Sequence, residues 1–251
     1  MTGPGRRDRR TDDRGVSDLI GFVTVFGVVV VSVAVVYAFG VGALADVQRA
    51  EAADNAERGF DIVADNMADV HRNGAPGRST ELDFEGGELA TTGQVTLTVK
   101  NGSGGLLGSF VATPIRYTDG ETGFYYAGGA VLRTDRDAAL VVNEPPFRFD
   151  PERSVISVVE TKPAGETTSI GGGSVRVTGR RVGSSVAAVE TAGVAFELNV
   201  TSPRYGAWRR YLEAEGLNCP DVYPAENRVV CRYTTDELFV RRTIVRVRLT
   251  P

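Results

Sequence analysis

Apolar residues fill the chain from Leu19 to Ala45, where Tyr37 is the only ionisable side chain. A helix rises about 1.5 Å per residue, so about 20 apolar residues cross the hydrocarbon core of a bilayer. Lipid offers the backbone no hydrogen-bond partners, which enforces a helix even where valine is abundant. The pattern predicts a membrane-spanning helix over residues 16–45, and its span includes Leu19, Ile20, Phe22, Val36 and Val41.

A different pattern begins after Ala45. Between residues 46 and 73, apolar side chains recur at alternating spacings of three and four, which places them on one face of an amphipathic helix. They are Ala53, Ala56, Phe60, Val63, Met67 and Val70. The first two are too small for a coiled-coil seam, so we expect this stripe to pack on the chain's own head. Gly74 and Pro76 are expected to end the helix.

Strand patterns dominate residues 79–251. Val95, Leu97 and Val99 alternate with polar residues, as in a half-buried strand. Short strands separated by glycine- and aspartate-containing turns predict antiparallel sheets, as a sandwich or a curved sheet packed on the helix. The fold class is therefore α+β. Further strands are expected in a meander over 108–149 with turns at 119–120, 128–129 and 135–137, and then over 154–162, 174–182, 193–202 and 239–251.

One short helix is expected among these strands, near residues 203–215. Trp208, Tyr211 and Leu212 recur at helical spacing and predict a face packed in the core. Ser202 is the expected N-cap, and Gly216 is expected to stop the helix.

Charge assigns an orientation to the expected span. The chain contains 42% hydrophobic and 24% charged residues, with a formal net charge of −4. This balance argues against nucleic acid as a partner. Residues 1–15 form a basic leader in which arginines outnumber aspartates. Because basic flanks stay on the cytoplasmic side, we expect a cytoplasmic N-terminus and an extracellular head at the cell membrane.

The junction between leader and span carries a family resemblance. The stretch RGVSDLIGF resembles the class III signal peptide of archaeal type IV prepilins, in which a membrane peptidase cuts after a small residue. The resemblance implies a cut between Gly15 and Val16, with Arg14 in the preceding position. It also implies a pilin-like surface protein, whose large head fits a minor pilin or pseudopilin in assembly or adhesion. The implied partners are membrane lipid, a prepilin peptidase, and an assembly platform or other pilin-like subunits.

Two other fates of the span stay open. The span can remain an uncleaved single-pass anchor, in which case the head binds an envelope component or ligand without polymerising. Alternatively, signal peptidase can cut after the Ala43-Leu44-Ala45 triplet, before Asp46. That apolar run is longer than the 7–15 residues typical of secretory signals.

Cysteines and sequons lie beyond the span. Cys219 and Cys231 are the only two cysteines, and their place outside the cytoplasm predicts a disulfide. Asn101 and Asn199 each begin an N-glycosylation sequon. Asn101, beside glycines, is the better acceptor, whereas Asn199 is expected within a strand.

Catalytic motifs are absent from the sequence. We find no nucleophile elbow, phosphate-binding loop or Cys-x-x-Cys pair, and His71 is the only histidine. The sequence therefore predicts a protein that is not an enzyme, with no catalytic residue, no cofactor and no metal site.

Overall fold

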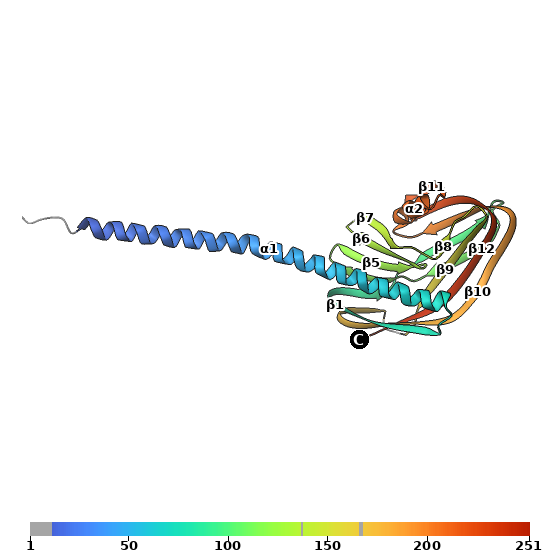
Figure 1. Cartoon of the computed structure of the whole chain (residues 1–251), viewed down its shortest axis with the longest axis horizontal. Coiled ribbons are helices and arrows are strands. Elements are labelled where there is room, and N and C mark those ends of the chain that lie inside the picture. The colour runs from blue at the N-terminus through green and yellow to red at the C-terminus, as the bar shows by residue number, and fades with distance from the viewer. Residues whose placement is uncertain (1–11, 137, 166–167) are drawn as a thin grey trace, which may run out of the picture. The chain divides into compact units, whose positions relative to one another are not determined.

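The computed structural model describes residues 12–251 apart from 137, 166 and 167 (Figure 1). The chain divides into two units, Met1–Glu51 and Ala52–Pro251, and we call the second unit the head. An apolar helix followed by a strand-rich domain confirms the α+β fold class. The elements are α1 Asp12–Arg72, β1 Gly77–Thr91, β2 Val95–Asn101, β3 Leu106–Ala112, β4 Ile115–Asp119, β5 Thr122–Ala127, β6 Ala130–Asp135, β7 Ala138–Asn143, β8 Phe147–Arg148, β9 Arg153–Pro163, β10 Ser169–Thr201, α2 Tyr205–Ala214, β11 Asn218–Tyr223, η1 Pro224–Glu226 and β12 Arg228–Thr250.

The strands form one large sheet in the order β7-β6-β5-β4-β1-β10-β12-β9-β8, to which β2 and β3 attach through β10, and β11 through β12. The meander predicted over 108–149 is confirmed only for β4–β7, because β3 at one end pairs with β2 and β8 at the other end pairs with β9. The turn from β5 to β6 consists of Gly128 and Gly129, whose φ angles of 65° and 103° favour glycine. Among the described residues the strand pairs are antiparallel, except that β9 and β12 run parallel.

Two strands are much longer than the sequence pattern predicts. The separate strands expected over 174–182 and 193–202 are parts of β10, which has 33 residues, and the strand expected over 239–251 is the end of β12, which has 23. The two strands pair along most of their length. Three register shifts in the ladder, at β10 residues 181–183, 186–188 and 191–194, accommodate the glycine- and serine-containing stretch without breaking the pairing.

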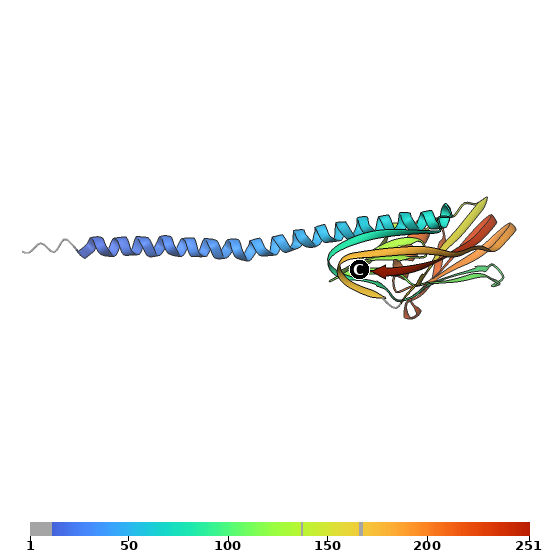
Figure 2. The same ribbon diagram turned by 90° about the horizontal axis from the view of Figure 1, so that it is seen from below.

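The last part of α1 packs on the sheet within the head. Figure 2 shows this part of the helix lying along the strands. Ala53, the first residue of the predicted stripe, is only partly buried, but Ala56, Phe60, Val63, Met67 and Val70 are at most 2% exposed, which confirms that the stripe faces the chain's own head. Their core, which we call the spine core, also contains side chains of β1, β4, β5 and β6, the first part of β10 and the last part of β12. In β12 the alternating residues Val245, Val247 and Leu249 are buried in the same core.

Close contact between helix and sheet depends on a glycine. A Cβ atom on Gly179 of β10 would lie 2.5 Å from Cε of Met67, closer than packed carbon atoms approach. Two ion pairs also join strands to the helix, Arg133–Glu57 at 2.7 Å and Arg78–Asp69 at 3.0 Å. The helix ends at Arg72, followed by Gly74 with a φ of 74°, as the sequence predicts.

A second core surrounds α2. We call it the α2 core; it contains Trp208 and Leu212 of α2 and apolar side chains of β2, β3, β9 and the remaining parts of β10 and β12. The sequence places this helix correctly but misassigns its first residue. Arg204, not Ser202, is the N-cap, because the Ser202 carbonyl accepts the N–H of Tyr205 and its hydroxyl accepts the N–H of Arg204 in a preceding turn.

The other end of α2 agrees with the sequence. Gly216 has a φ of 88° and donates its N–H to the carbonyl of Glu213, while Leu217 donates to Leu212. These two bonds form a Schellman motif, which satisfies carbonyls at the end of the helix.

Candidate functional site

The first candidate site is the apolar span of α1. Leu19–Phe39, 21 residues with a mean hydropathy of 2.8, has no buried side chain. At about 1.5 Å per residue the segment is about 30 Å long, which matches a bilayer core. Of the predicted span residues, Leu19 and Ile20 are each 62% exposed, Phe22 68% and Val36 71%. The span is compatible with a single-pass membrane anchor or a signal sequence.

The two aliphatic hydroxyl groups within the span bond to the helix itself. Thr24 Oγ1 donates to the carbonyl of Ile20, and Ser32 Oγ donates to that of Val28, each at 2.8 Å. Such bonds spare a hydroxyl the cost of lying unpaired in an apolar medium. The polar side chains of this segment are therefore compatible with lipid.

The predicted processing site and the end of the span are only partly described. Residues 1–11 of the leader lie outside the described residues. Arg14, Gly15 and Val16 belong to the helical backbone of α1, as does Val41, but their side chains lie outside the described set. Cleavage after Gly15 stays a prediction.

Head residues singled out in the sequence occupy contrasting positions. Cys219 and Cys231, 4% and 0% exposed, form the predicted disulfide with an S–S distance of 2.00 Å, and it joins β11 to β12. Asn101 lies at the end of β2, where its Oδ1 accepts bonds from Ser103 Oγ and Gly105 N–H. Asn199 lies in β10, as expected, and is 8% exposed between β2 and β12. This burial argues against a glycan at Asn199 and leaves Asn101 as the candidate acceptor.

His71 is buried where α1 ends. Its Nδ1 lies 2.9 Å from Oγ1 of Thr243 on β12, and the side chain is 4% exposed. Burial lowers the pKa of His71 to about 4, and the nearby guanidinium groups of Arg241 and Arg72 act in the same direction. Asp65 and Glu144 line the same small hollow. The histidine is therefore neutral at physiological pH, and we assign it a packing role.

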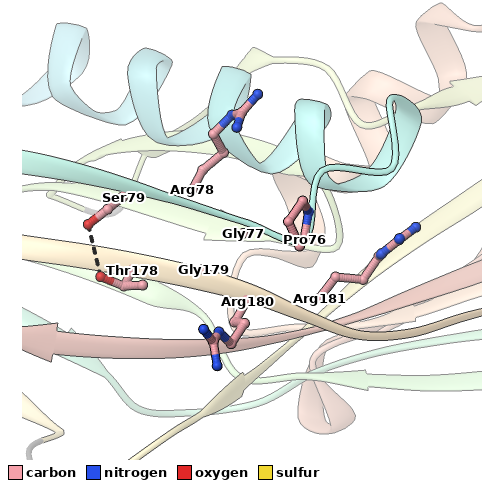
Figure 3. Close-up of a pocket in the computed structure, with 8 residues that line it drawn as sticks. All are labelled: Pro76, Gly77, Arg78, Ser79, Thr178, Gly179, Arg180 and Arg181. Carbon is pink, nitrogen blue, oxygen red and sulfur yellow. Dashed lines mark hydrogen bonds between the residues drawn. The ribbon is translucent and has the colours of Figure 1, made fainter.

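A hollow of about 520 Å³ lies where β1 meets β10, near the end of α1 (Figure 3). Ser79 Oγ and Thr178 Oγ1 lie 2.9 Å apart across the two strands. Arg78 points toward α1, where it binds Asp69, whereas Arg180 points to the opposite side of the sheet. The two arginines therefore serve different faces.

On that opposite side four arginines gather, which we call the basic face: Arg176, Arg180, Arg246 and Arg248. Arg180 lies directly across from Arg246, although like charges in opposite positions destabilise a sheet. Arg176 is offset by Glu81, 3.2 Å away. Strand alternation places Arg246 and Arg248 on one face of β12, and pairing with β10 adds Arg176 and Arg180. The alternating arginines of SVRVTGR were the available signal.

Among the described residues, no group of three or more histidine, cysteine or acidic side chains could hold a metal ion. The acidic turn residue Glu121 instead binds Arg136, with Arg136 Nε 2.7 Å from Glu121 Oε2. The absence of catalysis, cofactor and metal stays a prediction.

Comparison with known proteins adds one relationship. A model of a family of unknown function (DUF7289) matches residues 14–248. The chain belongs to this family. The DUF7289 match begins at Arg14 and takes in the span as well as nearly all of the head, so both are part of what the family shares. No curated protein and no solved structure matches the chain.

Proposed function

We propose that this member of the DUF7289 family is a membrane-anchored, pilin-like surface subunit of the minor pilin or pseudopilin kind. It acts in the assembly or adhesion of a type IV pilus-like structure. In this proposal the basic leader stays in the cytoplasm until a prepilin peptidase removes it, and the head lies outside the cell. Assembly platform proteins or other pilin-like subunits are its partners.

The organisation of α1 carries the proposal. Its span exposes every large apolar side chain between Leu19 and Phe39, while one face of its last part is buried in the head. Such exposed apolar surface needs lipid or other helices around it. A helix whose free half suits lipid or a filament core, and whose other half belongs to a β-rich head, is the organisation that the resemblance to archaeal pilins implies.

The mature N-terminus tests the proposal. Protein isolated from native membranes is expected to begin at Val16, as determined by N-terminal sequencing and intact mass. A Gly15→Leu variant is expected to retain the leader, because the resemblance implies a small residue before the cut. Gly15→Ala is the matched control and is expected to be processed normally.

Two results would overturn the pilin-like role. Native protein that retains residues 1–15 would support the alternative, a single-pass anchored ectodomain that binds an envelope component or ligand. Native protein that begins at Asp46 would support a secreted head.

A further inference from the structure

A cavity of about 170 Å³ lies beside the first turn of α2. Its walls come from the loop between β1 and β2, from β4 and β5, and from the residues that lead into α2. Tyr125 and Trp208 supply aromatic surface, and Arg116 and Arg204 supply charge. No acidic side chain is among the described residues that line it.

Three of these side chains carry a buried N–H group without a partner. They are Nε of Arg116, Nε of Arg204 and Nε1 of Trp208. Trp208 itself is completely buried. Native proteins leave few buried donors unpaired, because each costs about 1–3 kcal/mol. Three donors around one cavity therefore point to an acceptor that occupies it.

The first turn of α2 adds positive potential at the same place. The helix has 10 residues, its N-cap Arg204 makes no side-chain capping bond, and its first turn contains no acidic residue. The N–H groups of Arg204 and Tyr205 already donate to Ser202, so this terminus favours an anion through the dipole of the helix. No carboxylate of the helix itself offsets that potential.

Arg204 is held in position by Tyr125. Its guanidinium carbon lies 5.3 Å from the centre of the Tyr125 ring, and its NH2 group donates to the tyrosine hydroxyl at 3.4 Å. Contact with an aromatic face orients a guanidinium while leaving its edge free. Its Nε–H remains without an acceptor.

We infer that this cavity binds a small sugar acid through its carboxylate. A carboxylate supplies two acceptor oxygens in one plane, which suits arginine N–H groups, and its charge suits the two arginines and the helix terminus. The hydroxyls of Thr92 and Ser202 and the amide of Gln94 offer partners for sugar hydroxyls, and Val95 and Leu132 offer apolar wall. The inference goes beyond the proposed function, since it holds whether or not the leader is cleaved.

The test uses the full chain in detergent micelles. The protein contains one tryptophan, so intrinsic tryptophan fluorescence reports on Trp208 alone. Glucuronate is expected to cause a saturable change in fluorescence, while glucose, which has the same ring without the carboxylate, causes none at equal concentration. Arg116→Gln and Arg204→Gln are each expected to weaken glucuronate binding about tenfold, since each removes a charged hydrogen-bond donor.

Arg209→Gln is the matched control, because Arg209 lies on the same helix but binds Glu213 on the exposed face. Its affinity for glucuronate is expected to equal that of the unmodified chain. The inference would be overturned if glucuronate caused no saturable change in fluorescence, or if glucose or added sulfate caused an equal change. It would also be overturned if Arg209→Gln weakened glucuronate binding as much as the Arg116 and Arg204 variants do. The comparison of ligands on the unmodified chain decides the matter even if a variant fails to fold. The Gly15→Leu protein is expected to bind glucuronate normally, which separates this test from that of leader cleavage.

Discussion

The two parts of α1 are both helical, but they differ in where their apolar side chains lie and how far these are exposed. In the span, apolar side chains cover every face and are 49% to 75% exposed from Leu19 to Phe39. In the head, Phe60, Val63, Met67 and Val70 form one narrow stripe with at most 2% exposure. The stripe packs against apolar side chains of the sheet, whereas no described residue covers the span. The head part is thus packed within the fold, whereas the exposed span is compatible with a membrane anchor or a signal sequence.

Phe60→Ala tests the packing of the head part of α1 and is expected to have the largest effect of the variants proposed. Phe60 is fully buried, with its ring 5.8 Å from that of Phe124. Removing a buried phenylalanine ring is expected to lower the free energy of unfolding of the head by about 3–5 kcal/mol. Chemical denaturation of the full chain in detergent measures the loss.

Ile62→Ala is the matched control for Phe60→Ala, because Ile62 belongs to the same turns of α1 but is 51% exposed. Its expected effect is within about 0.5 kcal/mol. Equal destabilisation by both variants would contradict the packing described for this part of α1.

Val30→Arg tests whether the span inserts into a membrane. Val30 lies near the middle of Leu19–Phe39, where an arginine costs about 3 kcal/mol for insertion into a bilayer. The variant is expected to shift protein from the membrane fraction to the soluble or aggregated fraction, as measured by alkaline extraction and immunoblotting.

Two control variants sharpen the result for Val30. Val30→Leu is expected to stay in the membrane fraction, and so is Ile62→Arg, which places the same charge on an exposed position of the head part. Undiminished membrane retention of Val30→Arg would argue against this segment as the anchor.

His71 gives the smallest effect at neutral pH. Its pKa is about 4 in the folded protein, below its ordinary 6.5, so the unfolded chain binds a proton that the folded chain does not. The contribution of His71 is fully present above pH 6.5 and is lost as the pH falls toward 4, up to about 3 kcal/mol. Thermal unfolding between pH 7 and pH 4 measures this loss.

Comparison with His71→Gln isolates the histidine from the carboxylates that also titrate below pH 5. Glutamine keeps a hydrogen-bonding group toward Thr243 but does not titrate. The difference in stability between the two proteins is expected to change over the window from pH 6.5 to pH 4. A constant difference would mean that His71 titrates normally.

Much of this fold could be predicted from local sequence patterns. The span, the stripe, the end of α1 at Arg72, the β4–β7 meander and the Cys219–Cys231 pair follow from periodicity, turn residues and cysteine number, which are properties of neighbouring residues or of composition. The N-cap of α2 was missed because Ser202 is used by a preceding turn, a choice between two local bonds that the sequence leaves undecided.

Long-range pairing was outside the reach of these patterns. The continuity of β10 through residues 183–193 depends on β12, which supplies ladder bonds to a stretch whose glycines and serines resemble a loop. The cavity beside α2 was missed for the same reason. Arg116, Trp208 and the loop before β2 are far apart in sequence, and only the packing of β4, β5 and α2 brings them together.

The sequence by itself determined where the chain is suited to lipid, where it turns amphipathic and where it becomes strand, because hydrophobic period depends on the side chains of one segment at a time. Only the tertiary structure decided which arginines share a face, which asparagine is covered and which N–H groups lack an acceptor. Those properties depend on neighbours that folding, and not chain order, places side by side.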